Sequence, residues 1–188
     1  MIVLPVPPNF GDGVASDDDA DFAVIIEDPR WDQAVGDKDN AAEALARSCY
    51  AGVQKVLPVE QAEKLNGSLC VLCTDDAAVR TLNARYRQRD KATNVLSFPG
   101  TPSRGHAGDI ALGYETCARE AAERALPIGH HFAHLIIHGL LHLCGYDHID
   151  AIDAVQMETL EIEILETLSI ANPYADSEPM GVSERGGE

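Results

Sequence analysis

Short apolar runs alternate along this chain with longer segments in which apolar residues recur at helical spacing. The apolar runs predict β-strands at 22–27, 68–73, 95–98 and 109–112. The periodic segments predict helices at 38–56, 115–125, 128–144 and 152–168. A further helix is expected to begin after an N-cap at Asp75 or Asp76. We therefore expect a single-domain α+β fold with α/β-like interleaving of about four strands and about five helices. The histidine-rich segment is expected to form a central helix.

The spacing of these elements sets the strand directions and the domain bounds. The connection between the third and fourth strands is too short for a parallel crossover, so at least one strand should be antiparallel and the sheet mixed. The domain should cover residues 21–174, between an acidic arm (1–20) and a polar tail (175–188), both expected to be flexible. In the last helix, the residues expected to face the core are Val155, Leu160, Ile164, Leu165 and Leu168.

The net charge of −17 is concentrated at the two ends of the chain. Residues 1–37 hold nine acidic residues and one Arg, and residues 147–188 hold eleven acidic residues and one Arg, so the middle is close to neutral. Within the middle, residues 80–104 carry six basic residues against Asp90 alone. A polyanionic substrate is therefore compatible with the acidic composition if this stretch faces the active site.

The compartment and the role of the cysteines follow from the same composition. No basic segment precedes the apolar N-terminal residues, and no apolar run reaches the roughly 18 residues of a membrane span, which predicts a cytoplasmic protein. Five irregularly spaced cysteines do not form a disulfide framework. Cys70 and Cys73 should face opposite sides of a strand, and Cys144, two residues after His142, should lie on a different face of the helix. All three are interpreted as packing residues.

The segment from His138 to His148 has the form HxxxHxxGxxH. Histidines four residues apart on a helix lie on one face about 6 Å apart, so His138 and His142 can reach one metal ion. Gly145 can adopt the positive φ that ends the helix, which lets the chain turn back and deliver His148. Three neutral ligands leave one coordination position open, as in catalytic zinc sites, so we expect one Zn²⁺ per chain.

Four neighbouring residues complete this picture. His134 lies one turn before His138 and is interpreted as supporting a ligand or as a packing residue, rather than as a fourth ligand. His130 and His131 should begin the helix and face solvent. Asp147 has two interpretations of equal weight: it orients a ligand imidazole, or it is a turn residue.

Four motifs together resemble the YbeY endoribonuclease family of rRNA maturation factors. They are HGLLHLCGYDH, LNARYRQRDKATNVLSFPG, AGDIALGY and LEIEILETLSIANPY, and the resemblance covers about residues 22–174. The chain departs from the family in its longer acidic N-terminal arm and in the loop 101–108, which affects the substrate context.

The resemblance implies zinc ligands at His138, His142 and His148, with a functional arginine at Arg87. It also implies a single-strand-specific endoribonuclease that acts in maturation of the 16S rRNA 3′ end and in ribosome quality control. Expected partners are ribosomal RNA, small-subunit ribosomal proteins and a ribosome-assembly GTPase, with no membrane or DNA.

The chemistry expected of the residues fits that resemblance. Zinc would activate water and polarise the phosphodiester near His138, and the bidentate fork of Arg87 would stabilise charge on the phosphate. Without the family match, Arg87 reads as one surface arginine among several. Ser97 and Asn94 are expected either to contact the substrate or to fix the turn before Pro99.

Two other functions share the same motif. A metzincin-like metalloprotease uses HxxxHxxGxxH, but it places Glu directly after the first histidine as general base, whereas this chain has Gly139. Loss of that base costs on the order of 10²- to 10⁴-fold in rate, which argues against proteolysis. The second alternative is a non-catalytic ribosome-assembly factor whose zinc is structural.

Overall fold

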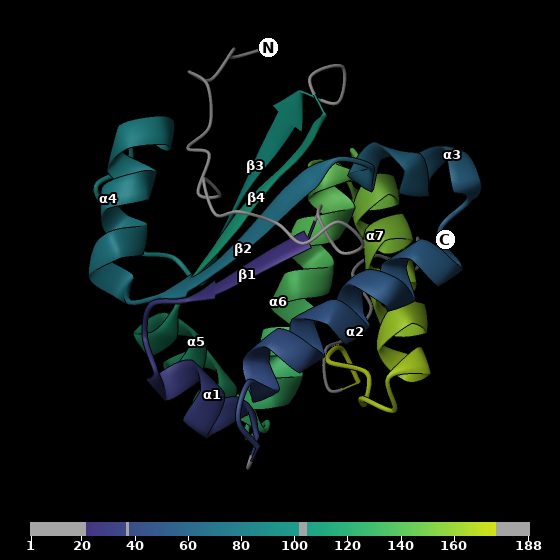
Figure 1. The fold of residues 1–188 in the computed structure, drawn as a ribbon. Coiled ribbons are helices and arrows are strands. Elements are labelled where there is room, and N and C mark those ends of the chain that lie inside the picture. The colour runs from purple at the N-terminus through teal and green to yellow at the C-terminus, as the bar shows by residue number, and fades with distance from the viewer. Residues whose placement is uncertain (1–21, 37, 102–104, 176–188) are drawn as a thin grey trace, which may run out of the picture.

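A four-stranded sheet lies at the centre of the computed structural model, which describes residues 22–36, 38–101 and 105–175 (Figure 1). The strands are β1 (Phe22–Ile26), β2 (Ser68–Thr74), β3 (Val95–Thr101) and β4 (His106–Gly113), in the order β1-β2-β4-β3. The first three of this order are parallel, and β3 runs antiparallel to β4. The predicted mixed sheet and α+β class are therefore confirmed. The expected flexible arm (1–20) lies outside the described residues, as does the tail beyond residue 175.

Five longer helices correspond to the predicted ones. They are α2 (Ala41–Val56), α4 (Asp76–Arg87), α5 (Tyr114–Glu123), α6 (Ile128–Leu143) and α7 (Ala151–Thr167). Asp75 caps α4 by accepting a hydrogen bond from the Ala78 N–H at 2.8 Å. The helices α2, α6 and α7 lie on one side of the sheet and α4 on the other (Figure 1).

Two short helices, α1 (Arg30–Val35) and α3 (Val59–Ala62), and a 3₁₀ turn at Glu63–Leu65 were not predicted. They have only six, four and three residues, too few to show an apolar period. A long-range contact holds α1 in place, because Trp31 is fully buried and its indole N–H donates to the Thr74 carbonyl at 3.0 Å.

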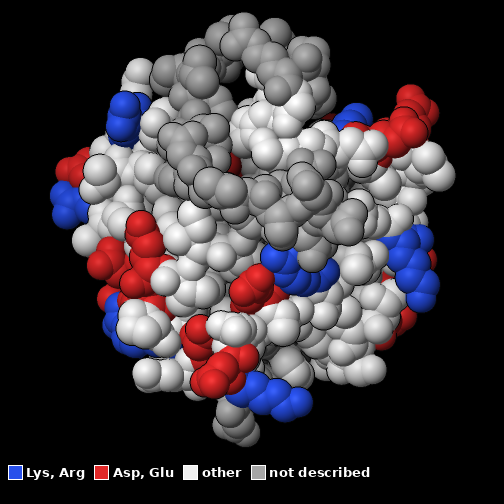
Figure 2. Space-filling model, in the orientation of Figure 1, with Lys and Arg blue, Asp and Glu red and all other residues white. Residues whose placement is uncertain are grey.

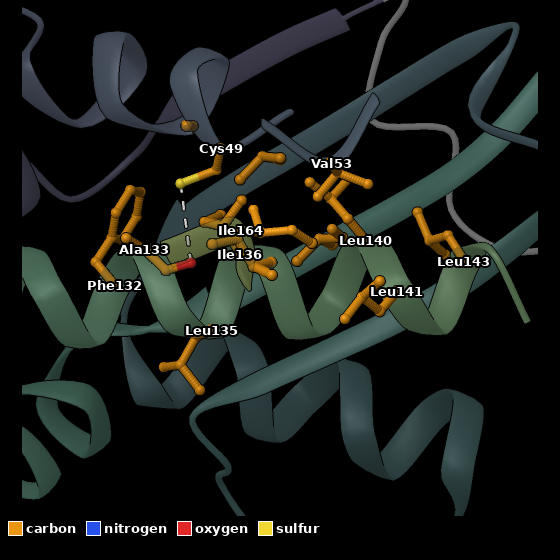
Figure 3. Packing of buried hydrophobic residues seen from close by; sticks show 14 of the residues in the cluster. Cys49, Val53, Phe132, Ala133, Leu135, Ile136, Leu140, Leu141, Leu143 and Ile164 are labelled. Carbon is orange, nitrogen blue, oxygen red and sulfur yellow. Dashed lines mark hydrogen bonds between the residues drawn. The ribbon is translucent and has the colours of Figure 1, made fainter. Parts of the chain in front are cut away.

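The helix α6 runs through the core and is apolar on almost every side, as expected for a fully buried helix. Val53 and Cys49 of α2 pack over it, whereas Leu135 points away from α2 (Figure 3). The Cys49 thiol contacts the Ala133 carbonyl at 3.8 Å. This packing fixes α6 against the rest of the domain, so side chains at its C-terminal end are held by a rigid element.

The structure corrects one detail of α7. Val155 was expected to face the core but is 52% exposed, whereas Met157 and Glu161 are buried. The inward stripe therefore runs through positions 157, 161 and 164, at helical spacing, and includes a carboxylate. The apolar pattern did not predict this stripe, because one of its buried positions is the acidic residue Glu161.

All five cysteines are buried and free, consistent with the packing interpretation. Among the described residues, no helix has both the length and the apolar character needed to cross a membrane.

Candidate metal centre

The end of α6 brings three histidines together. His138 and His142 lie one turn apart, and the helix ends after Leu143. Gly145 has a φ of +87°, the conformation expected at this position, and the Tyr146 N–H returns to the Leu141 carbonyl at 3.0 Å. His148 follows this turn. One nitrogen from each of the three histidines lies within 4.8 Å of the other two, so the group can hold a metal ion.

The hydrogen bonds of two of these rings determine where their lone pairs lie. His138 Nδ1 lies 2.7 Å from Glu161 Oε1, and His142 Nδ1 lies 3.0 Å from the Tyr146 carbonyl oxygen. Because a carbonyl or carboxylate oxygen only accepts, both Nδ1 atoms donate, and in the neutral rings both Nε2 atoms carry lone pairs. These Nε2 atoms lie 3.0 Å apart. A cation between them would relieve the repulsion of the lone pairs, so the residues fit a metal.

One of the three histidines, His142, has an altered pKa. Burial, assisted by the neighbouring His138, lowers the pKa of His142 below its usual value. Metal ligation requires the unprotonated nitrogen, so this shift reduces competition from protons.

Glu161 is a residue of the site that sequence reasoning missed. It is 1% exposed and accepts hydrogen bonds through both carboxylate oxygens, from His138, His134 and Tyr174. Burial alone would raise the pKa of Glu161, but the hydrogen bonds from the two histidines outweigh it and lower the pKa to about 2. A carboxylate behind a ligating histidine fixes the ring and increases its basicity. The signal that could have revealed it is a glutamate within the apolar stripe of α7.

The histidines open onto a pocket of about 480 Å³. Its lining includes the three histidines and Arg87 at the end of α4, although α4 covers the other side of the sheet. The Arg87 guanidinium donates to the Ser97 carbonyl at 2.9 Å. Burial and the charge of Arg89 lower the pKa of Arg87. The remaining pocket residues are Asn94, Val95, Ser97, Pro99, Gly145, Tyr146 and Asp147.

Three other predicted residues lie at this pocket or behind it. Asn94 is engaged in the protein, because its amide N–H donates to Glu120 at 2.9 Å and its oxygen accepts from the Val95 N–H at 2.7 Å. These contacts favour the turn interpretation. Asp147 accepts from the backbone N–H of His148 at 2.8 Å rather than from an imidazole. His134 contacts Glu161, not the pocket.

His131 was expected to face solvent, and this expectation is wrong. It is 2% exposed and contacts Glu120 at 2.9 Å. The helix begins at Ile128, so His131 already lies within its first turn, where α5 packs against α6 and covers it.

The basic stretch of the sequence is partly neutralised. Arg80 pairs with Asp90 at 2.6 Å, and Arg104 lies outside the described residues. On the face drawn in Figure 2, basic side chains alternate with acidic ones. The positive charge that faces the pocket is therefore carried by Arg87.

Fold and site together define an α+β protein with a three-histidine centre able to hold a metal, beside an arginine. Residues 31–169 match the family profile described as Endoribonuclease YbeY. The chain therefore belongs to the YbeY endoribonuclease family, as its motifs predicted.

Several curated relatives carry the same description. The protein of Chelativorans sp. is 48% identical over 152 residues, which cover 77% of this chain and 92% of the relative. That of Rhizobium meliloti is 40% identical over 168 residues, which cover 85% and 97% of the two chains. A Thermotoga maritima protein solved in solution matches with a TM-score of 0.50 at 21% identity, over 85% of this chain and 99% of that one. This last similarity supports the fold alone.

Proposed function

We propose that this protein is a zinc-dependent, single-strand-specific endoribonuclease acting in maturation of the 16S rRNA 3′ end and in ribosome quality control. The observation that carries the proposal is the convergence of three histidine nitrogens and the Arg87 guanidinium on one pocket. The endoribonuclease description of the curated relatives, which match most of this chain, supports the RNA substrate.

His138, His142 and His148 would hold the metal. Zinc bound by three histidines supplies Lewis acidity that activates water and polarises a phosphoryl oxygen near neutral pH. Glu161 holds the His138 ring through Nδ1, and the Tyr146 carbonyl does the same for His142. The protein's own contribution at this end of the pocket is thus to fix two imidazoles with their Nε2 atoms converging.

Arg87 would bind the scissile phosphate. Its hydrogen bond to the Ser97 carbonyl uses one of five guanidinium N–H donors, so the others can contact non-bridging oxygens. The same bond orients the guanidinium before the substrate arrives. A positive charge that is already positioned where negative charge develops in the transition state increases the reaction rate by about 10²- to 10³-fold.

The protease alternative is disfavoured by packing as well as by sequence. A Cβ on Gly139 would lie 2.9 Å from Ile110 Cδ1 and 3.1 Å from Ser97 Oγ. A glutamate there would therefore crowd the buried side chains of Ile110 and Ser97. The non-catalytic alternative is disfavoured by the pocket of about 480 Å³ beside the histidines, since a structural zinc is enclosed by its ligands. The ribosomal proteins, the assembly GTPase and the cytoplasmic location remain part of the proposal.

The test compares cleavage of single-stranded and double-stranded RNA by the wild type, Arg87→Ala, Arg87→Lys and Arg119→Ala. Arg119 is a matched control, because it is a surface arginine of α5 that pairs with Glu123 at 4.0 Å. We expect selective cleavage of single strands, a loss of about 10²-fold in Arg87→Ala, partial rescue by lysine and no change in Arg119→Ala. If Arg87→Ala cleaves RNA at the wild-type rate, Arg87 has no role in the reaction.

A further inference from the structure

The segment that follows α7 returns to the metal centre and places the Tyr174 hydroxyl against the buried carboxylate of Glu161. The hydroxyl is hydrogen-bonded to Glu161 Oε2 and lies 3.0 Å from His134 Nε2. His134 Nε2 itself lies 3.3 Å from the same carboxylate oxygen. The rings of His134 and Tyr174 meet edge to face, with centroids 5.5 Å apart. Two separate elements thus converge on one oxygen of Glu161.

The hydrogens of this cluster can be assigned from its acceptors. His134 Nδ1 is buried without a partner among the described residues, which is tolerable for a lone pair but costly for an N–H. The proton of neutral His134 therefore lies on Nε2, directed at Glu161 and Tyr174. The Tyr174 O–H then donates to Glu161 Oε2, because a carboxylate only accepts.

The two carboxylate oxygens of Glu161 have different hydrogen-bond partners. Oε2 is occupied by Tyr174 and His134, whereas Oε1 accepts from His138 Nδ1 at 2.7 Å. With Oε2 anchored, the carboxylate cannot rotate without breaking hydrogen bonds in a buried site. Its remaining oxygen is held toward His138, and the ring of His138 is held with Nε2 toward His142.

We propose that Tyr174 is a positioning residue for the metal centre, acting through Glu161 on His138. The inference rests on the proposed metal-binding function of the three histidines. In the absence of the Tyr174 hydroxyl, one oxygen of Glu161 retains only the longer contact to His134. The orientation of the His138 ring is then less restricted before the metal binds, and the metal affinity falls.

The test is the zinc dissociation constant of the full chain, measured by competition with a chromophoric chelator, in the wild type, Tyr174→Phe and Tyr114→Phe. Partners that orient metal ligands typically contribute 10- to 100-fold in affinity, so we expect Tyr174→Phe to bind zinc about 10-fold more weakly. Tyr114 packs against Trp31, near the other end of α6, and its variant should bind zinc like the wild type.

A double-mutant cycle separates positioning from a general loss of stability. In a Glu161→Ala background the carboxylate that links Tyr174 to His138 is absent, so Tyr174→Phe should cause no further loss of zinc affinity. Equal zinc affinity of Tyr174→Phe and wild type, or the same loss in both backgrounds, would overturn the proposal. A wild type that binds no zinc would instead refute the metal function itself, together with this inference.

Discussion

Substitution of Gly139 tests whether α6 must pack closely on the sheet to present the histidines. The glycine is buried on the face of α6 that meets Ser97 of β3 and Ile110 of β4. An added Cβ would lie 2.9 Å from Ile110 Cδ1, 3.1 Å from Ser97 Oγ and 3.2 Å from Ile110 Cγ2. Ile110 is fully buried, so it has little room to move away.

The expected magnitude is the difference between two effects. Overpacking a tight core costs about 1–3 kcal/mol, whereas replacing a helical glycine by alanine gains about 1 kcal/mol. Gly139→Ala should therefore lower the free energy of unfolding by about 1 kcal/mol. Gly139→Glu should lower it by several kcal/mol more, because it also buries a carboxylate without a partner.

Urea unfolding followed by the fluorescence of Trp31 provides the assay, since this is the chain's single tryptophan and is fully buried. Gly52→Ala in α2 is the matched control. Its Cβ would lie 3.2 Å from Ile164 Cγ2 and 3.3 Å from Thr167 Oγ1, less crowded than position 139, so its stability should change little. A Gly139→Glu protein with wild-type stability would refute the packing argument, and it would remove the structural objection to the metalloprotease alternative.

Two further predictions concern stability. Burial, opposed by the neighbouring His106, raises the pKa of Asp109 to about 6, so the folded protein binds this proton more tightly than the unfolded chain does. The free energy of unfolding should then fall as the pH rises from about 4 to 6. The substitution Asp109→Asn should remove this pH dependence and stabilise the protein at pH 7 by on the order of 1–3 kcal/mol. An unchanged pH dependence of the unfolding free energy in urea titrations of the variant would contradict the raised pKa of Asp109. Ile136→Ala, at a fully buried position of α6, should cost about 2–5 kcal/mol, whereas Ile149→Ala, at a position 86% exposed, should stay within about 0.5 kcal/mol in the same assay.

The longer elements could be predicted because their periodicity reflects which face is buried. The presence of at least one antiparallel strand followed from the short connection between β3 and β4. In contrast, α1 depends on the contact of Trp31 with Thr74, 43 residues away, which no local pattern encodes. Local sequence also failed for Val155, which is 52% exposed although its neighbours Ala154 and Met157 are buried, because apolar spacing alone does not fix which face of α7 is covered.

The candidate site shows the same division. His138, His142 and the turn at Gly145 followed from spacing, since helix geometry and glycine φ are local properties. Glu161 did not, because its role depends on α7 packing against α6. The placement of Arg87 at the pocket required the family resemblance, since its neighbours in sequence offer equally plausible arginines.

The most direct test of the central claim is the zinc content and RNA cleavage of the purified protein. The wild type, His142→Ala and the control His130→Ala would be compared by elemental mass spectrometry and by cleavage of a single-stranded RNA. We predict about one zinc per chain in the wild type and in His130→Ala, with zinc and cleavage both lost in His142→Ala, because two imidazoles hold the ion weakly. A metal-free His142→Ala protein that cleaves RNA at the wild-type rate would contradict the account.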